Sequence, residues 1–215
     1  MWQRTAAPAR DQVNVGCQAS KPVARSAVAM AGTHQSLRGQ LLLDGGSLQG
    51  SWFHRTVVLI CQHDPEGAFG LVLNRPSGTR LVEAVTTEVP EHLSDAPLFV
   101  GGPVQPGALS FLRTEAYLPD GSVMPNVDLG HSLEDLIELT KDFSAGRRIL
   151  VFAGYAGWSP GQLDDEIARN SWLVHPATPE RVFSTHPDRL WREILREKGG
   201  LFRILAESPE DPDAN

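Results

Sequence analysis

Two short runs, residues 56–61 and 149–153, constrain the fold of this chain most strongly. Both are apolar at nearly every position and rich in Val, Ile and Leu. A strand with one wet face alternates polar and apolar residues, whereas a strand covered on both faces does not. Both runs are also far shorter than the roughly 18 residues needed to cross a bilayer. We therefore predict two central strands of a sheet that is covered on both sides.

The flanking pattern predicts further strands and at least two helices. Ser132 and Asp135 have the spacing of a capping box and predict a helix that ends at Gly146. Pro187 predicts the first turn of a second helix, with Leu190, Trp191, Ile194 and Leu195 facing inward and Gly199 ending it. Other apolar runs predict strands at residues 40–43, 70–74 and 97–100, and weaker ones at 108–113 and 122–128. Hairpin-like spacings early in the chain favour an α+β domain with a mixed sheet over a doubly wound fold.

The two ends of the 215-residue chain differ from its middle. Residues 1–29 hold four bases, one acid and no apolar periodicity, which predicts a disordered extension, with Met30 as an alternative start. An organelle transit peptide is a second interpretation of this acid-poor segment. Residues 207–215 carry four acids and two prolines and are predicted to be a disordered tail. The predicted organisation is an extension over 1–35, one domain over 36–206 and the tail.

Charge and cysteine content bear on partners and compartment. The net charge is −7, and 15 basic residues face 25 acidic ones after position 29, which argues against direct nucleic-acid binding. Cys17 and Cys61 do not make a disulfide framework, so we predict a reducing, cytoplasmic setting. No apolar run is long enough to predict a membrane span. The expected partner is an unidentified small molecule or protein.

The segment from Gly157 to Gly161 matches the G-x-S-x-G pattern of hydrolases. In such enzymes the serine directly follows a strand, and the next residue donates its N–H to the oxyanion. Here the predicted strand ends near Ala153, and the next residue is Pro160, which has no N–H. We therefore interpret Ser159 as a helix N-cap, with Gln162 completing an S-x-x-Q box.

Cys61 and His63 form a second candidate site. Residues two apart on a strand face the same side, so the thiol and the imidazole are expected to lie side by side. A nearby histidine lowers a thiol pKa and makes the sulfur nucleophilic. Simple packing of a small buried cysteine is the alternative. The other histidines show no metal-ligand spacing, so neither a metal nor a cofactor is predicted.

Three glycine-bearing segments, 66–70, 100–103 and 154–157, are predicted as loops. None matches a phosphate-binding or dinucleotide fingerprint. Tyr155 and Trp158 either form a recognition surface in the last loop or cover the edge of the sheet.

Four ordered blocks, at residues 56–63, 67–76, 101–104 and 154–163, together with Glu166, Ile167 and Trp172, resemble the AlgH/YqgE family. The resemblance covers roughly residues 37–205. It implies a compact α+β domain whose mixed, bifurcated β-sheet is curled into a pseudo-barrel with helices around it. The family supplies no agreed catalytic set, and some members are described as transcriptional regulators. The matching polar and aromatic positions are candidates for ligand or partner binding: Cys61, His63, Asn74, Arg75, Tyr155, Trp158, Gln162 and Glu166.

Three functions follow as hypotheses. The first is a non-enzymatic binding or regulatory domain, since no complete catalytic constellation is visible. The second is a thiol-dependent or hydrolase-type enzyme centred on Cys61 and His63. The third is direct DNA binding, which the acidic domain disfavours.

Overall fold

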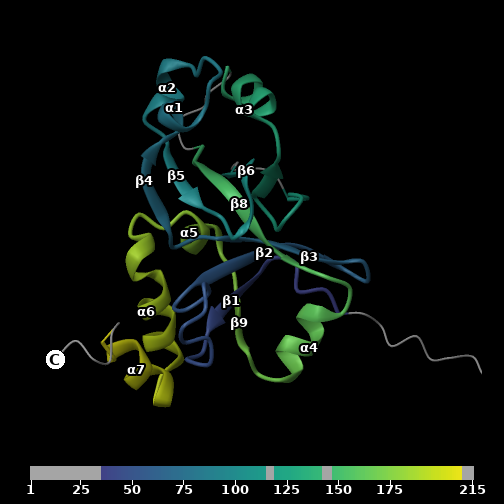
Figure 1. Ribbon diagram of the computed structural model, residues 1–215, viewed down its shortest axis with the longest axis vertical. Helices are drawn as coiled ribbons and strands as arrows, with labels where there is room; N and C mark the ends of the chain where they lie inside the picture. The colour runs from purple at the N-terminus through teal and green to yellow at the C-terminus, as the bar shows by residue number, and fades with distance from the viewer. Residues whose placement is uncertain (1–34, 115–118, 142–146, 210–215) are drawn as a thin grey trace, which may run out of the picture. The chain divides into compact units, whose positions relative to one another are not determined.

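The computed structural model describes residues 35–114, 119–141 and 147–209. The predicted extension up to residue 34, with Cys17, and the last six residues lie outside these ranges. The described residues form a mixed α+β domain built on a nine-stranded sheet (Figure 1). Its strands are β1 (Gln40–Asp44), β2 (Val57–Asp64), β3 (Gly67–Val72), β4 (Pro76–Arg80), β5 (Pro97–Val100), β6 (Val104–Thr114), β7 (Val127–Gly130), β8 (Ile149–Trp158) and β9 (Trp172–Pro176). Its helices are α1 (Leu81–Ala84), α2 (Glu91–Ser94), α3 (Leu133–Thr140), α4 (Gln162–Ala168), α5 (Pro179–Val182), α6 (Pro187–Lys198) and α7 (Gly200–Glu207).

The sheet is open and branches at β8. Its main path runs β4-β5-β8-β3-β2-β1-β9, and β6 pairs with both β8 and β7. β5 and β8 are parallel, whereas the other pairs between described strands are antiparallel, so the sheet is mixed as predicted. The predicted curling into a pseudo-barrel is wrong. The path ends on β4 and β9, which do not pair with each other in the described chain. Helices bury the apolar faces here, so the sheet need not close on itself.

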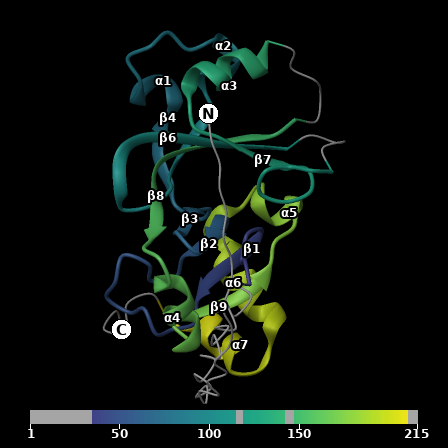
Figure 2. The same ribbon diagram turned by 90° about the vertical axis from the view of Figure 1, so that its right-hand side faces the viewer.

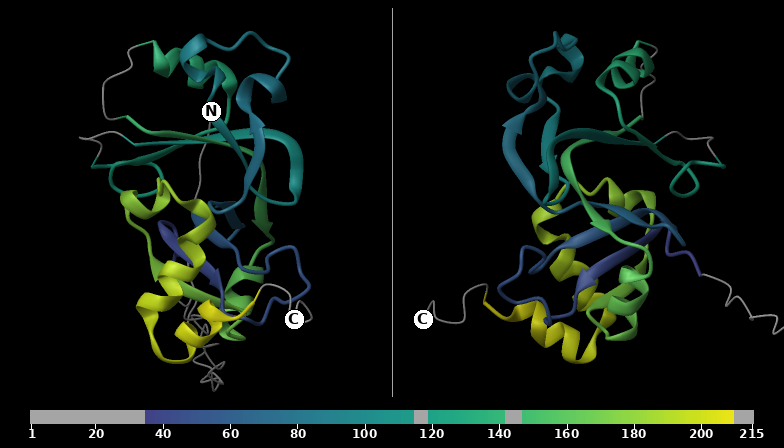
Figure 3. Two further views of the ribbon diagram at one scale, coloured as in Figure 1. Left: turned by 90° about the vertical axis from the view of Figure 1, so that its left-hand side faces the viewer. Right: turned by 45° about the vertical axis from the view of Figure 1, so that its right-hand side comes forward.

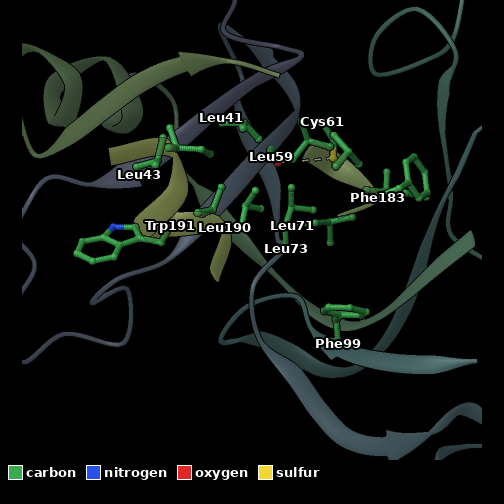
Figure 4. Close-up of a cluster of buried hydrophobic side chains, with 14 of the residues drawn as sticks. Leu41, Leu43, Leu59, Cys61, Leu71, Leu73, Phe99, Phe183, Leu190 and Trp191 are labelled. Carbon is green, nitrogen blue, oxygen red and sulfur yellow. Dashed lines mark hydrogen bonds between the residues drawn. The ribbon is translucent and has the colours of Figure 1, made fainter. Parts of the chain in front are cut away.

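Strand β2 is covered on both faces, as its sequence predicted. Val57 and Leu59 join a core with α5, α6 and α7, whereas Val58 and Ile60 join a second core with α4. All four side chains have no exposed surface. Figure 4 shows the first of these cores, with side chains of β1, β2 and β3 packed against α6.

A third core packs α1, α2 and α3 against the branch of the sheet that contains β4, β5 and β6. Leu81, Leu93 and Leu136 supply one buried side chain from each helix, and Phe111 and Val151 supply the sheet side. Figures 2 and 3 show these three helices beside β4 and β6, while α4, α6 and α7 lie beside β1 and β9. Each branch of the sheet therefore has helices of its own.

Strand β8 is longer than predicted, which corrects the interpretation of residues 154–157 as a loop. Residues 149–153 pair with β5 and β6, and residues 156–158 then pair with β3. Gly154 lies between these two stretches with a φ of 70°, and a β-carbon there would lie 2.6 Å from the carbonyl oxygen of Gly102. Glycine is needed at this position because side chains disfavour that φ and the backbone of Gly102 fills the space. The chain can thus change partners without ending the strand.

The two predicted helices exist. Ser132 caps α3 by accepting the N–H of Asp135, as the capping-box spacing predicted. Helix α3 ends at Thr140, and the predicted end near Gly146 lies outside the described residues. Helix α6 begins at Pro187 and buries Leu190, Trp191, Ile194 and Leu195. Among the described helices, none is long and apolar enough to span a bilayer.

The prediction for the start of α4 is wrong in position. This helix begins at Gln162, and its N-cap is Gly161 in the left-handed conformation, not Ser159. Half of the predicted box is present, since the Oε1 atom of Gln162 accepts the N–H of Ser159 at 3.1 Å. Ser159 also directly follows β8, so the spacing argument against a hydrolase elbow fails. The argument from Pro160 remains, because a proline has no N–H for an oxyanion.

Candidate functional site

The eight residues proposed from the sequence do not converge on one site. Asn74 and Arg75 line a cavity, whereas Trp158, Gln162 and Glu166 form a cluster of their own beside α4. Cys61 and Tyr155 belong to neither group. His63 lies beside α4, 3.6 Å from Asp164, and apart from Cys61.

The cavity that Asn74 and Arg75 line has a volume of about 380 Å³. It lies between the loop before β2, the turn after β3 and the start of α6. We call it the arginine pocket, and its lining residues are His54, Arg55, Asn74, Arg75, Asp188, Trp191 and Arg192. Among the described lining residues there are three arginines and one aspartate, so this part of the lining carries a net positive formal charge.

Arg75 is held in the wall of this pocket by a hydrogen bond and by an aromatic ring. Its Nη2 atom donates to the carbonyl oxygen of His54 at 3.3 Å, and its guanidinium carbon lies 4.2 Å from the ring centroid of Trp52. Among the described residues, no carboxylate lies within 4.0 Å of it. Burial lowers the pKa of this half-buried guanidinium, because desolvation disfavours the charged form. An anion bound beside Arg75 would relieve that cost.

Asn74 fixes the backbone that forms the floor of the pocket. Its amide Nδ2 donates to the carbonyl oxygen of Arg55, and its Oδ1 accepts the N–H of Val57, both at 2.8 Å. Because both its amide nitrogen and its amide oxygen bind the backbone, the main role of the Asn74 side chain is to position residues 55–57.

Arg55 has an unusual backbone conformation. Its φ is 54°, in the left-handed region that non-glycine residues enter rarely and at a cost of about 1–3 kcal/mol. Asp44 accepts its N–H and Asn74 donates to its carbonyl oxygen, each at 2.8 Å, so both sides of the residue are held. Its guanidinium carbon lies 5.1 Å from the ring centroid of Trp191. These two contacts fix the position of Arg55 at the wall of the cavity.

Asp44 organises the loop that carries His54 and Arg55, and the sequence analysis missed it. The side chain has no exposed surface, and its carboxylate accepts N–H groups from Gly46, Leu48 and Arg55. The Nδ1 atom of His54 lies 3.3 Å from the same carboxylate. The signal was an Asp followed by two glycines, which is typical of an Asx turn.

Trp158, Gln162 and Glu166 are brought together around the Glu166 carboxylate. Its Oε2 accepts the indole N–H groups of Trp158 at 2.9 Å and Trp172 at 2.8 Å, and its Oε1 accepts from the Gln162 amide at 2.9 Å. The two indole rings also contact Phe53. Because every polar group here is satisfied within the fold, the cluster ties α4 to β8 and β9.

Cys61 and His63 do not lie side by side, which contradicts the sequence expectation. Residue 60 pairs with residue 70 and residue 62 with residue 69, so β2 has a one-residue bulge at Cys61. A bulge breaks the two-residue alternation and turns the following side chains over. Cys61 therefore packs in the core near Phe183 (Figure 4), whereas His63 accepts the N–H of Leu37 and lies 3.6 Å from Asp164 of α4.

The Cys61 thiol is poorly suited to nucleophilic chemistry. Its side chain has no exposed surface, and burial strongly raises its pKa. Its Sγ lies 3.7 Å from the carbonyl oxygen of Leu59. A protonated, enclosed thiol is neither a ready nucleophile nor an accessible one.

Tyr155 packs against Phe69, with ring centroids 4.8 Å apart, and Phe69 in turn meets the ring of His131 at 5.5 Å. This places Tyr155 in β8 and half-buried, so covering the sheet accounts for it. The described residues contain no group of three or more His, Cys, Asp or Glu side chains able to hold a metal ion.

The fold and cavity define a single α+β domain with a branched mixed sheet and an arginine-lined pocket. The model of the AlgH-like family (DUF179) matches residues 41–203, and this chain belongs to that family. A UPF0301 protein of Chlorobium luteolum is 41% identical over 182 residues, which cover 82% of this chain and 94% of that protein. A UPF0301 protein of Streptomyces coelicolor is 36% identical, with 84% and 96% covered.

Two solved structures resemble this one. The solution structure of the AlgH protein from Pseudomonas aeruginosa is 27% identical, with a TM-score of 0.62, and the match covers 81% of this chain and 95% of that one. The crystal structure of protein DIP2367 from Corynebacterium diphtheriae has a TM-score of 0.66 at 23% identity, covering 81% and 93%, and shows the same fold. These relatives establish family and fold and do not specify a function.

Proposed function

We propose that this protein is a non-enzymatic binding domain whose ligand is a small anion, or a molecule with an anionic group, held in the arginine pocket. The observation that carries the proposal is Arg75, a half-buried guanidinium at a cavity wall that has no carboxylate of the described residues within 4.0 Å. Planar guanidinium groups bind carboxylate and phosphate oxygens in bidentate fashion. A regulatory role, including a link to transcription, remains an expectation from the family resemblance.

Three features support a ligand site over a purely structural cavity. Asp44 and Asn74 hold the backbone of Arg55 in a left-handed conformation at the cavity wall. Asp188, the acid of the lining, lies 3.8 Å from Arg189 and is exposed to solvent. The pocket also opens at the first turns of α6, where the helix dipole favours a negative charge.

The competing enzyme hypothesis depends on a thiol beside an imidazole. The bulge at Cys61 places the two side chains on opposite faces of β2, which removes the geometry that this hypothesis needs. Direct DNA binding has no further support, because a small pocket in a chain of net charge −7 offers no extended basic surface.

The proposal is tested by titrating the purified protein with inorganic pyrophosphate and following tryptophan fluorescence and thermal unfolding. Trp52 lies against Arg75 and Trp191 against Arg55, so an anion in the pocket is expected to change the emission. Arg75→Gln should weaken binding by about 10-fold or more, since a hydrogen bond to a charged group contributes roughly 1.5–3 kcal/mol.

The matched control is Lys141→Gln, which removes an exposed charge at the end of α3, on the other branch of the sheet from the pocket. It should leave the affinity within about twofold, because screening at physiological salt confines charge effects to about 8 Å. Binding that is equal in Arg75→Gln and the parent protein would refute the proposal, as would the absence of any response to phosphate, pyrophosphate or a dicarboxylate.

A further inference from the structure

A second cavity, of about 450 Å³, adjoins the arginine pocket. Its described lining residues are Gln49, Gly50, His54, Arg55, Leu205, Ser208 and Pro209. His54 and Arg55 line both cavities, so the two cavities are neighbours along these two residues. Each volume lies in the range of small-molecule sites, which is about 300–1,000 Å³. A ligand held in the arginine pocket therefore has room to extend past His54 and Arg55.

The second cavity differs from the arginine pocket in the chemistry of its wall. Among its described lining residues, Arg55 is the one with a permanent charge, and there is no carboxylate. Leu205 and Pro209 contribute apolar surface, and the hydroxyl of Ser208 donates to a backbone carbonyl oxygen of α7 at 3.1 Å. Beyond its chain neighbours, no atom of the described residues lies within 4 Å of the position that a β-carbon would take at Gly50. This cavity suits an uncharged, largely apolar group better than a second anion.

Arg55 holds the wall of the second cavity in place. Its Nη2 atom donates to the carbonyl oxygens of Ser208, at 2.9 Å, and Pro209. Residues 207–209 were expected to belong to a frayed tail, yet Glu207 ends α7. Arg55 thus ties the end of α7 to the loop before β2, and this donor atom is already engaged by the wall of the cavity.

We infer that the ligand of this protein is an organic anion with two parts, a phosphate or carboxylate held by Arg75 and an apolar group held in the second cavity. This inference rests on the proposed function, because the anionic part occupies the arginine pocket. Arg75 lines the arginine pocket and not the second cavity, whereas Leu205 lines the second cavity and not the pocket. The anionic part fixes the orientation of the ligand, and the apolar part adds affinity in proportion to the surface that it removes from water. Inorganic phosphate and pyrophosphate are then incomplete ligands.

The first experiment compares phosphate monoesters that differ only in their uncharged part. Methyl phosphate, phenyl phosphate and 3-phenylpropyl phosphate are titrated into the full chain by calorimetry at pH 8, where each carries nearly two negative charges. The two aryl esters differ in the length of the spacer that must pass His54 and Arg55. The tighter of them should bind at least about 10-fold more tightly than methyl phosphate, because burial of an aromatic ring is strongly favourable. Equal affinity of all three esters would overturn the inference.

The variant Leu205→Gln tests whether the ring lies in the second cavity, and Leu201→Gln on the same helix is its matched control. Leu205 is half-buried at the cavity wall, whereas Leu201 is 81% exposed and lines neither cavity. Leu205→Gln should weaken binding of the tighter aryl ester at least about fivefold and leave that of methyl phosphate within about twofold. Leu201→Gln should leave both within about twofold. No loss in Leu205→Gln, or an equal loss in Leu201→Gln, would contradict the placement of the ring.

A second readout locates the ring without changing the protein. Isotope-filtered nuclear Overhauser spectra of the complex with the tighter aryl ester should show contacts between the ring protons and the methyl groups of Leu205. Contacts with the indole of Trp52 or Trp191 in their place would put the ring inside the arginine pocket and overturn the inference.

The inference and the proposed function fail in different ways. If no ester bound, or if Arg75→Gln bound methyl phosphate with the affinity of the parent protein, the proposed function would be wrong and the inference with it. If methyl phosphate bound through Arg75 and neither aryl ester bound more tightly, the ligand site would stand and the two-part ligand would be refuted.

Discussion

Replacing Asp44 with alanine should lower the free energy of unfolding and also release the loop that positions Arg55 in the arginine pocket. The carboxylate is fully buried and accepts three backbone N–H groups, those of Gly46, Leu48 and Arg55. Each hydrogen bond to a charged group contributes roughly 1.5–3 kcal/mol when buried. The three donors belong to half-buried residues that water can partly reach, so about 1 kcal/mol each is the better value. The expected loss is about 3 kcal/mol.

Urea unfolding followed by circular dichroism measures this loss. Asp44→Asn keeps one acceptor oxygen and should lose about half as much as Asp44→Ala. The control is Asp120→Ala, an exposed aspartate, which should stay within about 0.5 kcal/mol of the parent. If Asp44→Ala unfolded at the same urea concentration and with the same slope as Asp120→Ala, the assignment of Asp44 as the organiser of this loop would be wrong.

Three further predictions concern other parts of the fold. In a Cys17→Ser background, Cys61 should react with a thiol reagent about 100-fold more slowly than in urea, since exposure needs an opening of about 3 kcal/mol. Burial, and then the neighbouring Arg181, lower the pKa of His175 in the folded state. The free energy of unfolding should therefore be unaffected by this group above about pH 6.5, and should decrease below that pH as the unfolded state takes up a proton first. Gly102→Ala should cost about 3 kcal/mol, because its β-carbon would lie 2.0 Å from a backbone carbon of β8.

Each of these has an outcome that contradicts it. If Cys61 reacted as fast in the folded protein as in urea, the thiol would be accessible to solvent and the prediction would be wrong. In a His175→Gln variant, the free energy of unfolding should fall less between pH 7 and 5.5 than in the parent protein. An unchanged dependence on pH would show that His175 does not cause the loss. Gly107→Ala is the control for Gly102→Ala, since no atom lies within 4 Å of its β-carbon site, and equal stability of the two variants would contradict the packing argument.

Much of the scaffold could be predicted from local sequence. The doubly apolar runs in β2 and β8, the Ser132 cap of α3 and the inward face of α6 all follow from patterns within a few residues. Such patterns report burial and capping, which the neighbouring residues largely decide. Strand β4 was missed because it has little apolar signal, and the short strand β9 and the short helices α1, α2 and α5 were missed because so few residues show no clear period.

The candidate site depended on contacts that no local pattern encodes. Asn74 and Arg75 were selected by resemblance, but Arg55 and Arg192 line the same pocket from other parts of the chain, and Asp44 holds the backbone of Arg55. The sequence also placed Cys61 beside His63 by strict alternation. A bulge formed by pairing with β3 reversed that alternation, and strand pairing is a property of two segments at once.

The sequence by itself thus determined which segments are buried, where two helices begin and which family the chain belongs to. The tertiary structure decided that β8 changes partners at Gly154, that the sheet stays open, and that guanidinium groups gather at one cavity. The reason is the range of the forces involved. Burial and capping act between near neighbours in sequence, whereas a pocket is made where segments far apart in the chain are packed together.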